Sequence, residues 1–116
     1  MITKPFEIYL ANLNPKKGHE VSKTRPVVVI HSQLIEGLLS TSIICPITTQ
    51  LSSATLLRVN VSLQDASTTG LSEPSDVIVD QIRSIDNQRL IKKLGELPVA
   101  QIEKLQKSLQ TILAVY

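Results

Sequence analysis

The sequence predicts a mainly β protein with added α structure (α+β), built as a small, partly open β-barrel with a C-terminal amphipathic helix. At least five short apolar or β-branched segments alternate with turn residues, and the apolar period changes to that of a helix near the C-terminus. The 116 residues fit one compact domain over 1–116, because no repeat, low-complexity tract or linker divides them.

The predicted strands begin near the N-terminus. Residues 7–13 carry apolar side chains on both faces, and the turn residues 14–18 (NPKKG) end this segment. Residues 26–30 form a β-branched run, which is typical of a buried strand, and the proline at its first position is tolerated there. Residues 42–47 make a third strand, and residues 57–63 alternate apolar with polar side chains, as expected of a half-exposed strand.

The second half of the chain adds one more strand and the helix. Residues 32–40 predict a short loop or helical turn, and residues 65–75 predict a loop rich in Ser, Thr and Gly. Residues 76–83 contain a further strand. From Val99 to Leu113 apolar residues recur at steps of three and four, so an amphipathic helix of about 15 residues is expected to pack on the sheet.

Composition argues against several classes of protein. No stretch approaches the ~20 apolar residues of a membrane span, and the N-terminus lacks the pattern of a signal peptide, so we expect a cytoplasmic protein. Cys45 is the only cysteine and is predicted to be a small core residue rather than a nucleophile. His19 and His31 have no ligand partners at a familiar metal spacing, so we expect no metal and no cofactor.

The basic residues are distributed unevenly although the net charge is only +2. Residues 1–60 carry six basic and three acidic side chains, whereas residues 61–116 carry six and seven. Basic side chains within one loop-like stretch would attract phosphate groups, but on charge alone an ordinary solvated lysine loop is favoured. The four residues of this stretch are Lys16, Lys17, Lys23 and Arg25.

Three polar segments are candidates for chemistry. In residues 18–26 (GHEVSKTRP), Arg25 precedes a proline and is therefore expected to be extended, with a guanidinium suited to a phosphodiester. The alternative is a surface ion pair between Arg25 and Glu20 worth ~0–1 kcal/mol, which this segment alone favours. Residues 46–50 (PITTQ) end a strand in two hydroxyls and an amide, which are either phosphate donors or ordinary strand-end residues.

The third segment is residues 80–86 (DQIRSID), where a strand runs into a polar turn. A structural role is favoured here. Asp86 is expected to cap the turn, and Gln81 to be a buried glutamine whose hydrogen bonds go to the backbone.

Taken together and in order, these segments resemble the MazF/PemK family of toxin endoribonucleases from type II toxin–antitoxin systems. The resemblance covers nearly the whole chain. It implies an SH3-like or CcdB-like barrel that forms a homodimer with an RNA groove across the dimer surface. The matching motifs are residues 8–10 (IYL), 14–15 (NP), Gly18, Glu20, 23–26 (KTRP), 28–30 (VVI), 46–50 (PITTQ), 81–86 (QIRSID) and 95–97 (GEL).

The resemblance implies metal-independent cleavage of single-stranded RNA, in particular mRNA, by attack of the substrate's own 2′-hydroxyl. Arg25 and Thr48 match the catalytic pair: the guanidinium would stabilise charge on the phosphate, and the hydroxyl would donate to a phosphoryl oxygen. Glu20 matches a general base or an orienter of Arg25. The residues expected to bind RNA lie in the same segments and are Lys16, Lys17, His19, Lys23, Thr24, Thr49, Gln50, Ser52 and Ser53.

The chain departs from the family pattern at two points. Phe6-Glu7 stand where Gly-Asp is usual, which is expected to alter the packing of the entry loop, and His19 stands where serine is common. The chain has only one Phe and two Tyr, so base recognition is expected to rely on hydrogen bonds rather than on aromatic stacking.

The resemblance also implies a partner, a MazE-like antitoxin whose disordered, acidic C-terminal segment folds across the RNA groove. Two other functions remain open on the same fold. One is a CcdB-like topoisomerase poison, which would not need Arg25 or Thr48 and whose tail does not resemble the Val115-Tyr116 ending. The other is a catalytically inactive module that binds RNA or antitoxin.

Overall fold

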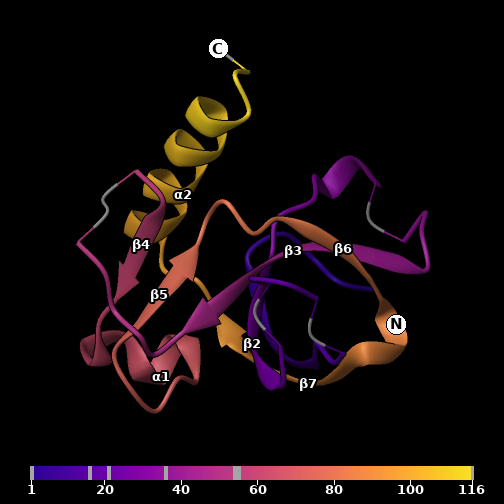
Figure 1. Cartoon of the computed structure of the whole chain (residues 1–116), viewed down its shortest axis with the longest axis horizontal. Helices are drawn as coiled ribbons and strands as arrows, with labels where there is room; N and C mark the ends of the chain where they lie inside the picture. Colours follow the sequence, from indigo (N-terminus) through magenta and orange to yellow (C-terminus); the bar gives the residue numbers. More distant parts are fainter. Residues whose placement is uncertain (1, 16, 21, 36, 54–55, 116) are drawn as a thin grey trace.

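The computed structural model describes residues 2–15, 17–20, 22–35, 37–53 and 56–115. Within these residues seven antiparallel strands form one sheet, and a long helix follows it (Figure 1). The order along the sheet is β4-β5-β3-β2-β1-β7, and β6 pairs with β3 outside this path. The strands are β1 Glu7–Asn12, β2 Thr24–Val29, β3 Thr41–Thr48, β4 Arg58–Val61, β5 Ser75–Ile78, β6 Arg83–Asp86 and β7 Leu90–Glu96.

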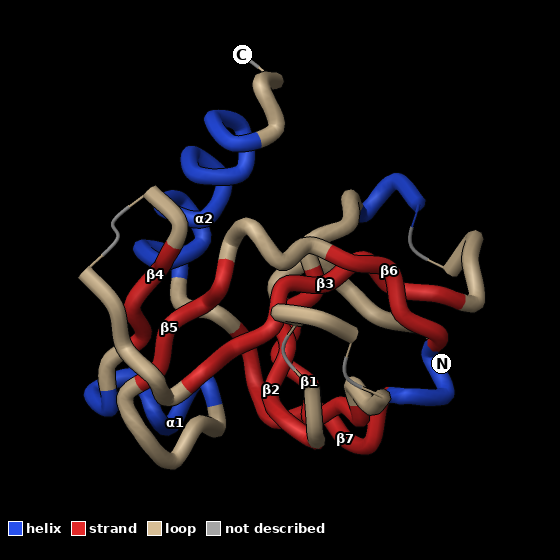
Figure 2. Tube along the Cα trace, viewed as in Figure 1, coloured by secondary structure: helices blue, strands red, loops and turns tan. Residues whose placement is uncertain are grey.

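Strand β3 joins the two halves of the sheet (Figure 2). Its first part pairs with β6 and its middle with β2, while Ile47 and Thr48 at its end pair with β5. In the described residues the outermost strands, β4 and β7, do not pair with each other, so the sheet is not closed. The predicted α+β class and partly open architecture are confirmed.

The sheet separates two buried apolar clusters. Because successive side chains of a strand point to opposite faces, Val28 packs in one cluster, whereas Val27 and Val29 pack in the other. The first cluster lies on the side covered by the C-terminal helix and includes Leu105. The second is formed by side chains from β1, β2, β3, β6 and β7, together with Leu13 just after β1. Because β1, β2 and β3 contribute to both clusters, their sequences contain continuous apolar runs rather than an alternation.

The C-terminal helix α2 (Val99–Ile112) agrees with its prediction to within one residue. Leu105 is fully buried against the sheet, and Ile102 and Leu109 are packed against the same cluster. Pro98 precedes the helix in an extended conformation and accepts the first helical hydrogen bond. The helix lies beside β4, and its C-terminal end projects away from the sheet (Figure 1). None of the described helices is both long and apolar enough to cross a membrane.

Strand β2 begins two residues before its predicted start, so the prediction that Pro26 stands at the first position is wrong. Pro26 is the third residue of the strand and faces Leu10 of β1. Pairing of β2 with β3 begins only at Val27, so the ladder with β3 does not require the missing N–H of the proline.

The predicted loop over 65–75 is also partly wrong. It contains the end of a 3-10 turn, η2 (Leu63–Asp65), and the one-turn helix α1 (Ala66–Thr69). The Ser62 side chain accepts a hydrogen bond from the Gln64 N–H, and Gly70 ends the helix in a left-handed conformation (φ = 73°). Gly70, one of the residues that indicate a loop, therefore ends a short helix.

Further differences concern the strands and two short turns. The predicted strand 57–63 is shorter, Arg58–Val61, and the predicted loop or turn at 32–40 contains the 3-10 turn η1 (Gln33–Ile35). Strands β6 and β7 were not predicted, and the 3-10 turn η3 (Asn87–Arg89) lies between them. Among the strands that the structure describes, β7 pairs with β1 alone, and most of its side chains are exposed, so it shows neither a regular alternation nor an apolar run.

Candidate active site

Arg25 and Thr48 line the same surface pocket, which has a volume of about 610 Å³. Arg25 is the second residue of β2 and Thr48 is the last residue of β3. The last pair between these antiparallel strands is Val27–Pro46. Arg25 lies two residues before Val27, and Thr48 lies two residues after Pro46. Because the strands are antiparallel, continuing this register places both side chains at the same end of the ladder and on the same face. Two side chains that are 23 residues apart in sequence are thereby brought together.

The Arg25 guanidinium is half-buried and is held by the backbone. Its Nε–H donates to the carbonyl oxygen of Ser22 at 2.8 Å. Within the described part of the chain this is its one hydrogen bond, so both Nη groups are free for a ligand. Burial lowers the pKa of Arg25 from its usual 12.5. A partly desolvated cation that lacks a carboxylate partner attracts a phosphate more strongly than a solvated one.

The Thr48 hydroxyl is almost fully buried and is oriented by the next turn of the chain. Its oxygen accepts a hydrogen bond from the Gln50 N–H at 3.1 Å. A hydroxyl carries one proton to donate. Because Oγ1 is already an acceptor here, that proton remains available to an oxygen in the pocket.

The loop before β2 is fastened at both ends. The Leu13 N–H donates to the Lys23 carbonyl at 2.9 Å, and the Lys23 N–H donates to the Asn14 side chain at 3.0 Å. Lys23 has a left-handed backbone (φ = 70°), which is unfavourable for a residue with a Cβ. Phe6, which replaces the usual glycine of the resemblance, is also left-handed (φ = 66°). At both of these positions a residue with a Cβ adopts a conformation that favours glycine.

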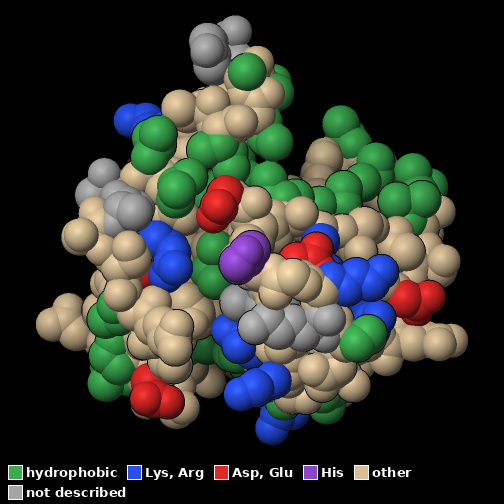
Figure 3. Space-filling view, in the orientation of Figure 1, with side chains coloured by type: hydrophobic (Ala, Val, Ile, Leu, Met, Phe, Trp, Pro, Cys, Tyr) green, Lys and Arg blue, Asp and Glu red, His purple; other side chains and the backbone are tan. Residues whose placement is uncertain are grey.

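Most of the RNA-binding residues predicted from the sequence lie around this pocket. The lining includes exposed Glu20, together with His19, Lys23, Thr24, Thr49 and Gln50. The alternative of an ion pair between Arg25 and Glu20 is wrong, because no such pair occurs among these described residues. Figure 3 shows Lys and Arg side chains gathered around the histidine on the visible face of the molecule.

The remaining predicted residues lie elsewhere. Ser52 and Ser53 line a neighbouring pocket of about 430 Å³, which also contains Arg58 and Asp76. Lys17 is exposed and is not part of the wall of the 610 Å³ pocket. Lys16 lies outside the described residues.

Three polar residues of the 610 Å³ pocket, Ser22, Arg58 and Gln81, are not among the functional residues predicted from the sequence. Arg58 begins an alternating strand, where a charged side chain is usually solvated, so its place in the pocket gave no signal in the sequence. Gln81 was interpreted as a buried glutamine but is half-buried and lines the pocket. The predicted cap is confirmed, since Asp86 accepts from the Gln88 N–H at 2.8 Å.

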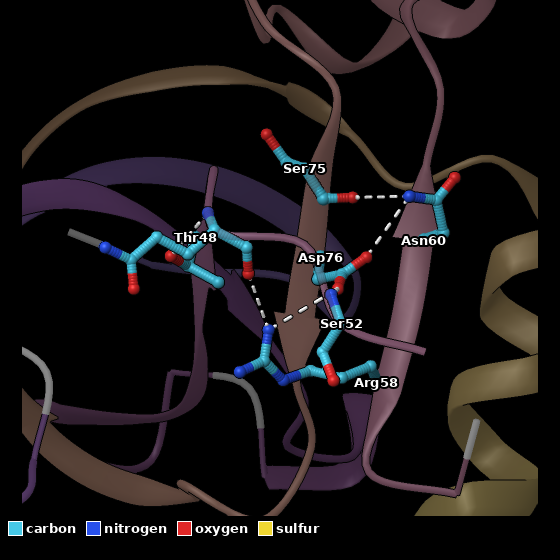
Figure 4. A network of polar contacts seen from close by, with 7 residues as sticks. Thr48, Ser52, Arg58, Asn60, Ser75 and Asp76 are labelled. Atoms are coloured by element: carbon cyan, nitrogen blue, oxygen red, sulfur yellow. Dashed lines mark hydrogen bonds and ion pairs between the residues drawn. The ribbon is translucent and has the colours of Figure 1, made fainter. Parts of the chain in front are cut away.

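Arg58 belongs to a polar network that lies next to Thr48 (Figure 4). Its Nη1 donates to the Gln50 carbonyl at 2.9 Å and contacts the Asp76 carboxylate at 3.4 Å. The Asp76 side chain is 2% exposed and also accepts from the Ser52 N–H at 2.8 Å and from Asn60 Nδ2 at 3.2 Å. The network connects β4 and β5 to the segment that follows Thr48.

The other groups considered for chemistry have structural surroundings. Cys45 is fully buried, and burial raises the pKa of its thiol to about 12, so it is a core residue as predicted. His31 is buried and contacts the Thr3 carbonyl at 3.1 Å. In the described ranges, no three His, Cys, Asp or Glu side chains lie close enough to hold a metal ion.

Comparison with known proteins identifies the family. Residues 4–113 match the family described as PemK-like, MazF-like toxin of type II toxin-antitoxin system. Endoribonuclease EndoA of Bacillus subtilis is 36% identical over 115 residues, which is 99% of this chain and 97% of that protein. Endoribonuclease MazF2 of Mycobacterium bovis is 30% identical over 113 residues, or 97% of this chain and 98% of that protein.

Solved structures show the same fold at lower identity. The crystal structure of MazF (Form-I) from Deinococcus radiodurans has a TM-score of 0.82 at 22% identity and covers 99% of each chain. An endoribonuclease in complex with its cognate antitoxin from Mycobacterial species has a TM-score of 0.74 at 18% identity, covering 98% of this chain and 95% of that one. The resemblance drawn from the sequence is confirmed, and the chain belongs to the PemK-like, MazF-like toxin family of type II toxin–antitoxin systems.

Proposed function

We propose that this protein is a cytoplasmic toxin, one domain over 1–116, that cleaves single-stranded RNA at a short recurring sequence without a metal ion. The observation that carries the proposal is the meeting of Arg25 and Thr48 in one pocket. The relatives named endoribonuclease, which match over almost their whole length, support the same activity.

The cleavage step is an internal transfer at phosphorus. The 2′-oxygen of the substrate bonds to the adjacent phosphorus and the bond from phosphorus to the 5′-oxygen breaks, which leaves a 2′,3′-cyclic phosphate and a 5′-hydroxyl. Arg25 and Thr48 hold the phosphoryl oxygens, whose negative charge grows in the transition state. Glu20, exposed at the rim of the pocket, either accepts the 2′-hydroxyl proton or orients Arg25 while water accepts that proton. The leaving 5′-oxygen takes a proton from water and becomes the 5′-hydroxyl.

The RNA strand is bound by polar and basic side chains around the reacting phosphate. His19, Lys23, Thr24, Thr49 and Gln50 line the pocket and are the closest candidates. Lys17, Ser52 and Ser53 lie outside the 610 Å³ pocket, so they would contact nucleotides further along the RNA strand. Base recognition then relies on hydrogen bonds, since the pocket wall contains no Phe, Tyr or Trp among its described residues.

Two protein partners are part of the proposal. One is a second copy of the chain, related by a two-fold axis, so that the RNA groove crosses the dimer. The other is a MazE-like antitoxin whose acidic segment covers the basic residues of the groove. The antitoxin is supported by the similar fold of solved complexes described as MazE-MazF from Deinococcus radiodurans and as an endoribonuclease with its cognate antitoxin.

The test is cleavage of a long structureless RNA by the purified protein in EDTA, with the cut ends mapped. We expect cuts at one short sequence that leave 5′-hydroxyl ends, and almost no activity in Arg25→Ala or Thr48→Ala. Lys92→Gln, an exposed change on β7, serves as the control that keeps full activity. Intact RNA with inhibited topoisomerase, or intact RNA that is tightly bound, would exclude the proposed nuclease in favour of a poison or an inactive binding module.

A further inference from the structure

A second arginine, Arg58, lines the pocket from the other side of β3. Arg58 begins β4, whereas Arg25 lies in β2, and both side chains line the pocket that contains the Thr48 hydroxyl. The Arg58 side chain is 23% exposed, so part of the guanidinium faces solvent at the pocket. Nothing in the amino-acid pattern marks this residue, because its place depends on how β4 pairs with β5.

Arg58 is held in place through one of its three nitrogens. Nη1 makes both of its hydrogen bonds, to the Gln50 carbonyl and to Asp76. Across the described residues, neither Nε nor Nη2 of Arg58 makes a hydrogen bond. A guanidinium anchored through one nitrogen can present the others to a phosphate as a fork.

The anchor is a carboxylate that lies in the interior. Asp76 is 1% exposed and receives three donors: the Arg58 guanidinium, the Ser52 N–H and the Asn60 amide. A charged group at such a site is kept there by hydrogen bonds and by an opposite charge, since an isolated buried carboxylate is very unfavourable. Figure 4 shows Asp76 between β4 and the segment after Thr48, in a position to fix the direction of Arg58.

Arg58 is also linked to Thr48, through the backbone of Gln50. Arg58 donates to the carbonyl of Gln50, and the N–H of the same residue donates to the Thr48 hydroxyl oxygen. Gln50 therefore links the second guanidinium to the catalytic hydroxyl through its own backbone. A displacement of Arg58 would be transmitted to Thr48 through a single residue.

We infer that Arg58 binds an RNA phosphate in the same pocket as Arg25, and that buried Asp76 is a positioning residue that orients Arg58 toward it. This inference rests on the proposed RNA cleavage and adds a residue pair to it. Arg58 supplies a second positive charge to the bound strand, and Asp76 restricts the guanidinium to the direction in which its two free nitrogens face the pocket.

The first experiment compares Arg58→Gln and Arg58→Lys with the unmodified protein and with the charge-matched control Lys92→Gln. For RNA cleavage we expect Arg58→Gln to lower kcat/KM by about tenfold to hundredfold, and Arg58→Lys to recover part of this loss. Binding to uncleavable single-stranded DNA is measured over a range of salt concentrations. Loss of one phosphate contact should reduce the slope of log K against log salt by about 0.7 in Arg58→Gln, with no change in the control.

The second experiment is Asp76→Asn, which makes the pocket more positive by one charge. If only the net charge mattered, RNA binding and cleavage would both improve. We expect instead that KM rises about threefold to tenfold with little change in kcat, because Arg58 loses the anchor that directs it to a phosphate of the bound strand. Thermal unfolding of each variant shows whether it is folded under the conditions of the assay.

Several results would overturn the inference. They are an Arg58→Gln protein with unchanged kcat/KM and unchanged salt slope, an Asp76→Asn protein with raised activity, or, should Arg58→Gln not fold, a fully active Arg58→Lys. If the unmodified protein does not cleave RNA, the proposed function fails by itself. The salt slopes on single-stranded DNA still decide whether Arg58 contacts a phosphate.

Discussion

The two sides of the pocket hold their arginines in different ways. On the β2 side, Arg25 is fixed by the Ser22 carbonyl, a neutral group, and no carboxylate of the described residues pairs with its charge. On the β4 side, Arg58 is fixed by Asp76 and is partly neutralised by it. An uncompensated, partly desolvated cation interacts more strongly with developing negative charge than a paired one. The comparison indicates that Arg25 contributes to the reaction and that Arg58 mainly contributes to holding the strand.

The largest expected effect is the loss of kcat for RNA cleavage when Arg25 is replaced. Arg25→Lys keeps the charge but removes the fork and the hydrogen bond from Nε to Ser22. We expect kcat to fall by roughly a hundred- to thousandfold, which is far more than in Arg58→Lys. Single-turnover cleavage assays measure the chemical step directly. Equal losses in the two lysine variants would contradict the assigned difference between the two sides.

The next effect concerns the hydroxyl between the two arginines. Thr48→Val keeps the shape of the side chain and removes both the donor and the acceptor of the Gln50 N–H. We expect kcat to fall about a hundredfold, while Thr48→Ser, which keeps the hydroxyl, stays within about tenfold of the unmodified protein. A Val variant as active as the Ser variant would show that the hydroxyl is not a donor in the reaction.

On the β4 side we expect a loss of stability as well as of activity. Asp76→Ala removes the acceptor of three donors, including a half-buried guanidinium. The free energy of unfolding should decrease by about 2 kcal/mol. Urea unfolding followed by circular dichroism measures it. Arg25→Ala should leave stability within about 0.5 kcal/mol, because Arg25 makes one hydrogen bond to a carbonyl and has no charged partner among the described residues.

The smallest effect is expected in the loop on the β2 side. Lys23→Gly relieves a left-handed backbone, which costs about 1–2 kcal/mol for a residue with a Cβ, and adds about 0.5–1 kcal/mol of backbone entropy loss on folding. We expect a net gain in stability of about 0.5 kcal/mol. Replacement of Lys23 by Gln, which removes the same charge without the backbone effect, is the matched control. A loss of more than about 1 kcal/mol in the Gly variant would show that Lys23 stabilises the loop by other contacts.

The elements that sequence reasoning predicted well are those whose pattern is local. The helix Val99–Ile112 has an apolar face of its own, and the run at Val27–Val29 is buried on both faces of the sheet. Among the described strands β7 pairs with β1 alone, at an edge of the sheet, so its side chains carry little of the apolar pattern. Its place follows from pairing with β1, which is far away in the sequence, as in the pair Glu7–Glu96.

At the candidate site, too, the sequence pattern predicts only the residues that stand in recognisable local motifs. Arg25 and Thr48 were singled out because each stands in a motif of the resembled family, and their closeness follows from the register of β2 and β3. Asp76 and Arg58 belong to no such motif. A carboxylate at the beginning of a strand is expected to be solvated, and Asp76 is buried only because Arg58, Asn60 and Ser52 reach it from residues 16 to 24 positions away.

The most direct test asks whether Arg25 and Thr48 act on the same phosphate. It is a double-mutant cycle with Arg25→Ala, Thr48→Val and the double variant, followed by single-turnover cleavage of one RNA at its mapped site. Groups that act as a unit are strongly non-additive, so the double variant should be no more than about threefold slower than the slower single variant. Losses that multiply in the double variant would mean that the two side chains act independently, and this would contradict the account.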